Sequence, residues 1–161
     1  MNSKMKIDSY FERLKHEKSQ SGIGQVIDKI WQLWLWSGDS EIDYLMETGC
    51  SLISNKKYEG AISTFTEIIK KAPAYAEGWN KRATTYYLKG DYQEAIDDIQ
   101  QTLAIEARHF GALSGLATIY LILNNHAGAL DTFRKLYEIY PHRKNLKSKI
   151  DCLEGVINEQ N

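Results

Sequence analysis

Apolar and small side chains recur in this chain every 34 positions, against a background of polar residues. The recurring positions agree in side-chain size as well as in polarity over three successive copies. Such a period is the signature of a repeated structural unit that buries its apolar face against the next unit. Five sets of positions are in register: Leu45, Trp79 and Leu113; Gly49, Ala83 and Ala117; Leu52, Tyr86 and Tyr120; Ala61, Ala95 and Ala129; and Phe65, Ile99 and Phe133.

Each period contains two helical patterns separated by a turn. In the middle copy, Trp79, Ala83 and Tyr86 follow the spacing of one helix face, and the pattern stops at Gly90. A second pattern of the same kind then runs through Ala95. Because Ala83 and Ala95 are small, two antiparallel helices can approach closely at these positions. The period therefore predicts a helical hairpin.

The spacing of the middle copy is that of a known repeat. It reads Trp79-x3-Ala83-x2-Tyr86, followed by Gly90-x-Tyr92-x2-Ala95-x3-Ile99. The pattern resembles the tetratricopeptide repeat (TPR), which has 34 residues. It departs from that family at Thr48 and Arg82, where an apolar residue is usual, and at Ala107, where a proline is usual. The resemblance implies an all-α fold, an α-solenoid of three stacked hairpins, with copies at about 42–75, 76–109 and 110–143.

A closer likeness extends over two longer segments. They read IWQLWLWSGDSEIDYLM (residues 30–46) and AEGWNKRATTYYLKGDYQEAIDDIQQTLAIEARHFGALSGL (residues 76–116). Both are similar to small stand-alone bacterial TPR proteins, many of which carry an export signal. We expect a cytoplasmic protein, because the N-terminus contains no signal-peptide core. The likeness adds a periplasmic or organellar location as the alternative if a signal was removed.

The flanks of the repeat region are predicted to be helical caps, because a stack of hairpins ends in apolar faces that need cover. Residues 1–39 form an N-terminal extension whose apolar stripe should face the first repeat, and residues 19–24 read as a flexible joint within it. Ser40 is the expected N-cap of the first repeat helix. Residues 144–161 form a C-terminal capping helix with a short polar tail. The apolar positions of the two flanks are Ile23, Val26, Ile27, Ile30, Trp31 and Trp34 on one side, and Leu146, Ile150, Leu153 and Ile157 on the other.

Composition agrees with one mostly helical globular domain. The chain has 161 residues, of which 43% are hydrophobic and 25% charged, and only two are prolines. A net charge of −1 gives no support to nucleic-acid binding. The polar N-terminus contains no signal-peptide core, and no apolar run is long enough for a membrane span.

No catalytic, metal-binding or cofactor-binding site is predicted. The four histidines, His16, His109, His126 and His142, form no metal-binding motif, and His109 is expected to be solvated or to cap a helix. Asp97 and Asp98 are expected on a solvated face. Ser114 lies inside a helical pattern rather than on the sharp turn that a nucleophile elbow needs. Cys50 and Cys152 make no disulfide framework.

The resemblance implies that the first helix of each hairpin lines a concave groove. The groove positions are those not used for packing between helices, and helical phase supports them as a set. Trp36 lies off the N-terminal apolar stripe and is a possible flank contact. The groove candidates are Met46, Cys50 and Ile53 in copy one, Glu77, Asn80, Lys81, Thr84 and Tyr87 in copy two, and Ser114, Thr118 and Leu121 in copy three.

One known TPR activity can be tested on these positions. Repeats that bind the acidic C-terminal tail of heat-shock chaperones use a clamp of Lys, Arg and Asn. The matching positions here are Met46, Cys50, Lys81, Gly111 and Gly115, of which only Lys81 could hold a carboxylate. No acidic-tail clamp is therefore expected.

These observations together predict a non-enzymatic protein–protein interaction module. It is expected to be a monomer or weak dimer that binds a peptide segment of a partner protein in the groove. The alternative is a structural or assembly-factor subunit that docks through its flanking helices. The identity of the partner does not follow from the repeats, since they specify shape rather than ligand.

Overall fold

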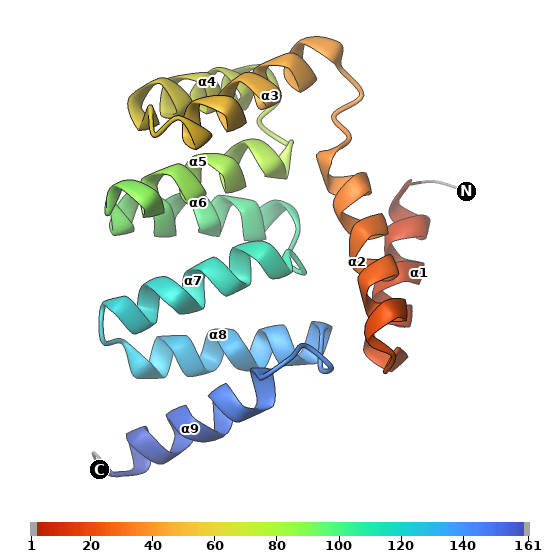
Figure 1. Cartoon of the computed structure of the whole chain (residues 1–161), viewed down its shortest axis with the longest axis vertical. Helices are drawn as coiled ribbons and strands as arrows, with labels where there is room; N and C mark the ends of the chain where they lie inside the picture. The colour runs from red at the N-terminus through yellow and green to blue at the C-terminus, as the bar shows by residue number, and fades with distance from the viewer. Residues whose placement is uncertain (1–2, 160–161) are drawn as a thin grey trace. The chain divides into compact units, whose positions relative to one another are not determined.

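The computed structural model describes residues 3–159 of the chain, which form nine helices and no strand (Figure 1). The predicted all-α fold class is confirmed. Residues 1–2 and 160–161, the last of which belong to the predicted polar tail, lie outside the described part. In chain order the helices are α1 (Ser3–His16), α2 (Gln20–Leu35), α3 (Ser40–Ser54), α4 (Tyr58–Lys71), α5 (Ala76–Lys89), α6 (Tyr92–Ile105), α7 (Phe110–Ile122), α8 (His126–Ile139) and α9 (Leu146–Glu159).

The described residues divide into two compact units. One unit is residues 36–115, and the other comprises residues 3–35 together with 116–159. In the first unit α3 packs against α4, α4 against α5, and α5 against α6 (Figure 1). Helices α3–α4 and α5–α6 are therefore the hairpins that the sequence predicts for the first two repeats.

Small residues at the hairpin crossings allow this close packing. Ala61 and Ala95 are completely buried, and Ala83 is 2% exposed. A Cβ atom at Gly49 would lie 2.5 Å from the ring of Phe65, which is itself fully buried. Real Cβ atoms do not approach so closely, so the first hairpin requires glycine at this position.

The first two repeat helices begin and end at identifiable signals. Gly90 ends α5 in the left-handed conformation, with φ 89°, at the position where the sequence predicts the stop. The predicted N-cap of α3 is wrong by one residue. The carboxylate of Asp39 accepts hydrogen bonds from the backbone N–H of Glu41 at 2.8 Å and of Ile42 at 3.4 Å, and Ser40 is already helical. Aspartate in an extended conformation is among the strongest N-caps.

In the second unit the N-terminal helices pack against each other, and α1 also contacts α8. The ring centroids of Phe11 on α1 and Trp34 on α2 lie 5.9 Å apart. The predicted flexible joint at residues 19–24 is wrong, because α2 already begins at Gln20. The Ser19 hydroxyl accepts a hydrogen bond from Gly22 N–H at 3.1 Å and so caps that first turn.

Helix α9 packs against α8 (Figure 1), and three of its four predicted apolar positions are buried: Leu146, Ile150 and Leu153. The contact between α1 and α8 has no counterpart in the predictions from sequence. The assignment of the two flanks as caps of the repeat stack stays a prediction. Within residues 3–159, none of the helices is long and apolar enough to cross a membrane.

Candidate functional site

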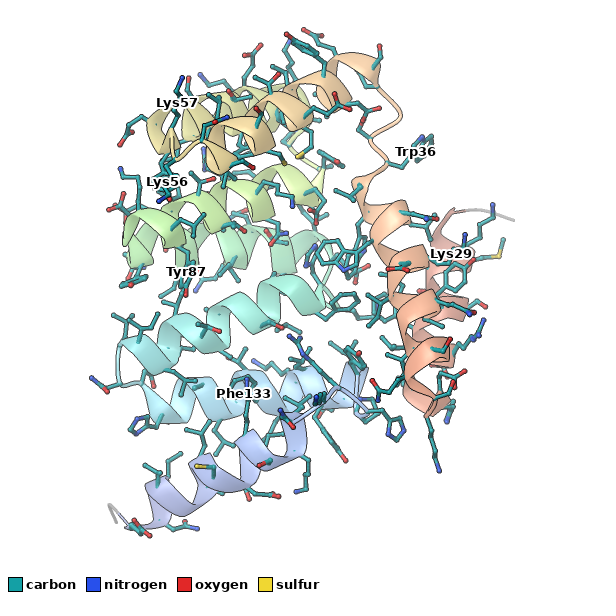
Figure 2. All side chains as sticks on the ribbon, viewed as in Figure 1. Lys29, Trp36, Lys56, Lys57, Tyr87 and Phe133 are labelled. Carbon is teal, nitrogen blue, oxygen red and sulfur yellow. The ribbon has the colours of Figure 1, made fainter. Side chains whose placement is uncertain are left out.

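Helices α3 and α5 are the first helices of successive hairpins, and they contact each other. Both carry predicted groove residues that remain at least partly exposed. Figure 2 labels Tyr87, which lies near the C-terminal end of α5. We define the α3–α5 face by Cys50 and Ile53 on α3 and by Lys81, Thr84 and Tyr87 on α5.

The aromatic ring of the α3–α5 face, Tyr87, packs against a ring of the next helix. The centroids of Tyr87 and of Tyr92, the first residue of α6, are 6.1 Å apart, with the ring planes at 50°. Tyr87 remains half-buried, and Thr84 one turn earlier is exposed. The Thr84 hydroxyl donates to the backbone carbonyl of Asn80 at 3.0 Å and keeps its lone pairs for a further donor.

The α3 side of the face rests on the core of the first repeat. Cys50 and Ile53 pack against the buried cluster that includes Phe65 and Ile68. Tyr75 belongs to the same packing, and burial raises the pKa of its phenol far above the usual value, with the acidic groups of Glu77 and Asp43 raising it further. The phenol therefore stays neutral and adds no charge beside the face.

Three predicted groove residues need correction. Met46 is 8% exposed and belongs to the first-repeat core, Glu77 is fully buried, and Asn80 is 8% exposed. The Asn80 amide donates to both carboxylate oxygens of Glu77 at 3.4 Å. A buried side chain with its polar atoms occupied inside the protein offers no surface to a peptide.

Glu77 instead forms a buried pair with His109. The His109 Nε2 and Glu77 Oε1 atoms are 2.5 Å apart, and both side chains are inaccessible to solvent. The His109 Nδ1 atom accepts a hydrogen bond from Ala112 N–H at 3.1 Å, so Nε2 is the nitrogen that carries the proton and donates to Glu77. From the sequence, His109 was expected either to be solvated or to cap a helix. It caps the start of α7 and is buried.

A second buried polar group joins three helices. Arg82 on α5 donates to both carboxylate oxygens of Asp98 on α6, from Nε at 2.7 Å and from Nη2 at 2.8 Å. Its Nη1 donates to the Thr66 hydroxyl on α4 at 3.0 Å. The guanidinium also lies over the rings of Trp79 and Tyr86, at 5.3 Å and 5.8 Å from their centroids.

The Arg82–Asp98 pair corrects one expectation. Asp98 is 4% exposed and does not lie on a solvated face. Arg82, where the repeat usually has an apolar residue, pairs with it. The hydrogen bonds with Asp98 raise the pKa of the Arg82 guanidinium above its usual value. The residues one period away from Asp98 are Thr64 and Thr132, so the pair is confined to the middle copy.

The predicted groove residues of copy three lie along α7. The Ser114 hydroxyl donates to the backbone carbonyl of Phe110 at 2.6 Å, as the Thr84 hydroxyl does to Asn80. Thr118 is exposed, and Leu121 is 37% exposed. Their place in one groove with the α3–α5 face stays a prediction.

Trp36 is exposed, as its position off the apolar stripe predicts. It lies in the segment between α2 and α3, is 66% exposed, and projects away from the ribbon (Figure 2). Its role as a partner contact stays a prediction. Within residues 3–159 no group of three or more His, Cys, Asp or Glu side chains could hold a metal ion.

The sequence of the chain is similar to those of known repeat proteins. Two tetratricopeptide repeat models match the chain, one over residues 43–75 and the other over residues 74–142. A TPR repeat-containing protein of Rhizobium etli is 33% identical over 150 residues, which are 93% of this chain and 74% of that protein.

Two solved structures are similar in fold at lower identity. The Sgt2 TPR domain of Aspergillus fumigatus superposes with a TM-score of 0.67 at 23% identity, over 76% of this chain and 83% of the domain. The first TPR domain of Spaghetti (RPAP3), solved bound to the HSP90 peptide SRMEEVD, superposes with a TM-score of 0.67 at 19% identity, over 74% of this chain and 96% of that domain. The structural neighbours confirm the α-solenoid architecture, and with the repeat matches and the Rhizobium relative they establish that the chain belongs to the tetratricopeptide repeat family.

Proposed function

We propose that the chain is a protein-interaction module that binds a peptide segment of a partner on the α3–α5 face. The observation that carries the proposal is the half-buried ring of Tyr87, supported by Tyr92 at 6.1 Å and flanked by the exposed Thr84. An aromatic side chain that is already immobilised loses little entropy when a ligand covers it. Such rings are enriched among the residues that dominate binding energy.

The chemistry of the face suits a peptide of mixed character. Ile53 and Tyr87 supply apolar area, while the Thr84 hydroxyl and the Lys81 ammonium supply hydrogen bonds to a peptide backbone. Because these residues come from two packed helices, their spacing is fixed before binding, and the binding cost is correspondingly lower.

Related TPR domains support peptide binding as the activity. The Spaghetti (RPAP3) domain is bound to an acidic HSP90 peptide, and a domain of yeast Sti1 is in a complex with a pHsp70 ligand. We carry over the binding of a peptide but not its acidic character. Met46 is buried here, and Cys50 is uncharged, which leaves Lys81 as the cation among the clamp positions on α3 and α5.

The test is capture of the partner from extracts of the organism that encodes the chain. Replacing Tyr87 by Ala should weaken capture by about 1–3 kcal/mol while leaving the far-UV circular dichroism unchanged. The matched control is Gln101→Ala on the exposed side of α6, which should capture as the unaltered chain does. Equal capture by all three proteins would reject the α3–α5 face.

A second candidate function rests on Trp36. Its 66% exposure favours docking into a larger assembly through the flank. In that case Trp36→Ala should abolish capture and Tyr87→Ala should not. A chain that binds peptides on the α3–α5 face should sediment alone as a monomer or weak dimer, whereas an assembly subunit should self-associate without its partner.

A further inference from the structure

One face of α3 is open where the equivalent face of α5 is covered. The α3 end face consists of Tyr44, Glu47, Thr48 and Ser51, which lie within three or four positions of one another and therefore share one side of the helix. Tyr44 is 69% exposed, Glu47 and Ser51 are exposed, and Thr48 is half-buried.

The residues one period later on α5 are Gly78, Lys81, Arg82 and Thr85. Two of them, Gly78 and Arg82, lie against helix α4. A Cβ atom at Gly78 would lie 3.0 Å from Ile68 and 3.4 Å from Ile69 of α4, and Arg82 donates to Thr66 of the same helix. Thr85 is fully buried. By repeat symmetry, the α3 end face is equivalent to the α5 surface against which α4 packs. A helix can therefore pack against it in the same way.

Two exposed aromatic side chains lie near the N-terminal end of α3. The Ser37 hydroxyl donates to the Asp43 carboxylate, which ties the segment that precedes α3 to the first turn of that helix. The bond brings Trp36 and Tyr44, each the chain neighbour of one partner, to the same end of α3. At 66% and 69% they are the most exposed large apolar side chains in the described part of the chain. Large exposed aromatic side chains at one end of a helix make this end a candidate interaction surface.

The charge around the two rings is negative. Asp39, Glu41, Asp43 and Glu47 lie within nine residues, and α3 contains neither lysine nor arginine. Lys71 of α4 pairs with Glu41 at 2.9 Å and neutralises one of the four. A partner that covers the rings must therefore approach through a negative field, which favours cationic side chains and disfavours acidic ones.

We propose that the α3 end face binds a cationic amphipathic helix of a partner protein. The partner segment is a helix because α4 packs on the equivalent surface of α5. It is positively charged because carboxylates surround Tyr44. Apolar side chains of the partner cover the rings of Trp36 and Tyr44, and its lysines or arginines meet Glu47 and Asp43, with cation–π contacts to the rings.

The α3 end face is distinct from the α3–α5 face. Tyr44 and Cys50 are six positions apart, which separates them by about 120° around the helix axis. A peptide on the α3–α5 face and a helix on the α3 end face would therefore contact different sides of α3. Tyr44 and Tyr87 can therefore be changed separately, each at one of the two surfaces.

The test uses the full chain and a designed probe. The probe is a 14-residue helical peptide, the length of α4, with leucines on one face and lysines on the other. A counterpart with glutamate in place of every lysine is the charge control. Binding is measured by calorimetry at low and high salt, and NMR of the isotope-labelled chain reports which helix is perturbed.

The variant Tyr44→Ala/Glu47→Lys should bind the lysine probe at least about tenfold more weakly than the unaltered chain. The matched control is Tyr137→Ala/Glu138→Lys, which makes the same changes at exposed positions of α8 and should stay within about twofold. Tyr87→Ala should have no effect, the glutamate peptide should not bind, and salt should weaken binding of the lysine probe. The single variants Tyr44→Ala and Glu47→Lys repeat the test with smaller changes to the fold.

Other outcomes overturn the inference. Equal affinity of the α3 variants and the unaltered chain, equal loss in the α8 control, or tighter binding of the glutamate peptide would each do so. Loss of probe binding in Tyr87→Ala alone would assign the peptide to the α3–α5 face and leave the proposed function standing.

Discussion

The buried ion pair of the middle repeat gives the sharpest stability prediction. Arg82 and Asp98 make two charge-assisted hydrogen bonds, at 2.7 Å and 2.8 Å, and their side chains are only 17% and 6% exposed. Replacing Arg82 by Leu would leave the Asp98 carboxylate in the helix interface without its cation. Removing one partner of a buried pair costs about 3–5 kcal/mol, because the remaining charge is uncompensated.

The double variant Arg82→Leu/Asp98→Leu should recover part of this loss. It removes both charges, so no unpaired carboxylate stays buried, and apolar replacements of buried pairs are often close to neutral. What remains lost is the hydrogen bond to Thr66 and the stacking on Trp79 and Tyr86, at roughly 1–3 kcal/mol together. The two single variants should therefore be more destabilised than the double variant.

The assay is equilibrium urea unfolding followed by far-UV circular dichroism on the four proteins of the cycle. An exposed pair on α9, Lys147 and Asp151 at 2.7 Å, is the control. Its side chains are 65% and 55% exposed, so Lys147→Ala should cost no more than about 1 kcal/mol. Arg82→Leu unfolding at the same urea concentration as the unaltered chain, or single-variant losses that simply add in the double variant, would refute the reasoning.

Three further predictions follow from packing and charge. Gly49→Ala should destabilise the chain by roughly 1–3 kcal/mol in urea unfolding, because its Cβ would meet the buried Phe65 ring, whereas Gly60→Ala, with side-chain contacts no closer than 3.5 Å, should be neutral or stabilising. Ala95→Leu should cost roughly 1–3 kcal/mol by overpacking a fully buried crossing, and a melting temperature equal to that of the unaltered chain would contradict the hairpin register. A chaperone tail such as SRMEEVD should not bind with micromolar affinity in calorimetry, because a single ion pair at Lys81 supplies about 0–1 kcal/mol of the ~8 kcal/mol required.

The hairpins could be predicted because their determinants repeat. Ala61, Ala95 and Ala129 recur every 34 positions, and all three are completely buried. The close helix crossing requires a small residue in each copy. The same requirement therefore appears three times in the sequence. The stop at Gly90 was equally readable, since its positive φ is a conformation that glycine adopts without strain.

The buried polar pairs could not be predicted for the opposite reason. Arg82–Asp98 occurs in one copy, and Glu77–His109 joins two positions that are not equivalent within the repeat. A charged residue is normally assigned to solvent, and only knowledge of the facing helix reveals its partner. Periodicity carries no information about a contact that does not recur.

The candidate site was predicted only in part, because helical phase tells which side chains share a face and not what covers that face. It correctly left Thr84 and Tyr87 accessible on α5. It failed for Glu77 and Asn80 on the same helix, because Glu77 is buried against both Asn80 and His109. That these two side chains are buried could be learned only from the three-dimensional structure.

The most direct test of the proposed activity is site-specific photo-cross-linking at position 87. A chain with benzoylphenylalanine in place of Tyr87 would be irradiated in the organism that encodes it, and the cross-linked peptides identified by mass spectrometry. A chain with the same probe in place of Gln101 on α6 is the control. We predict that one partner segment is cross-linked from position 87 and not from position 101. Cross-linking from position 87 that does not exceed the control would contradict peptide binding on the α3–α5 face.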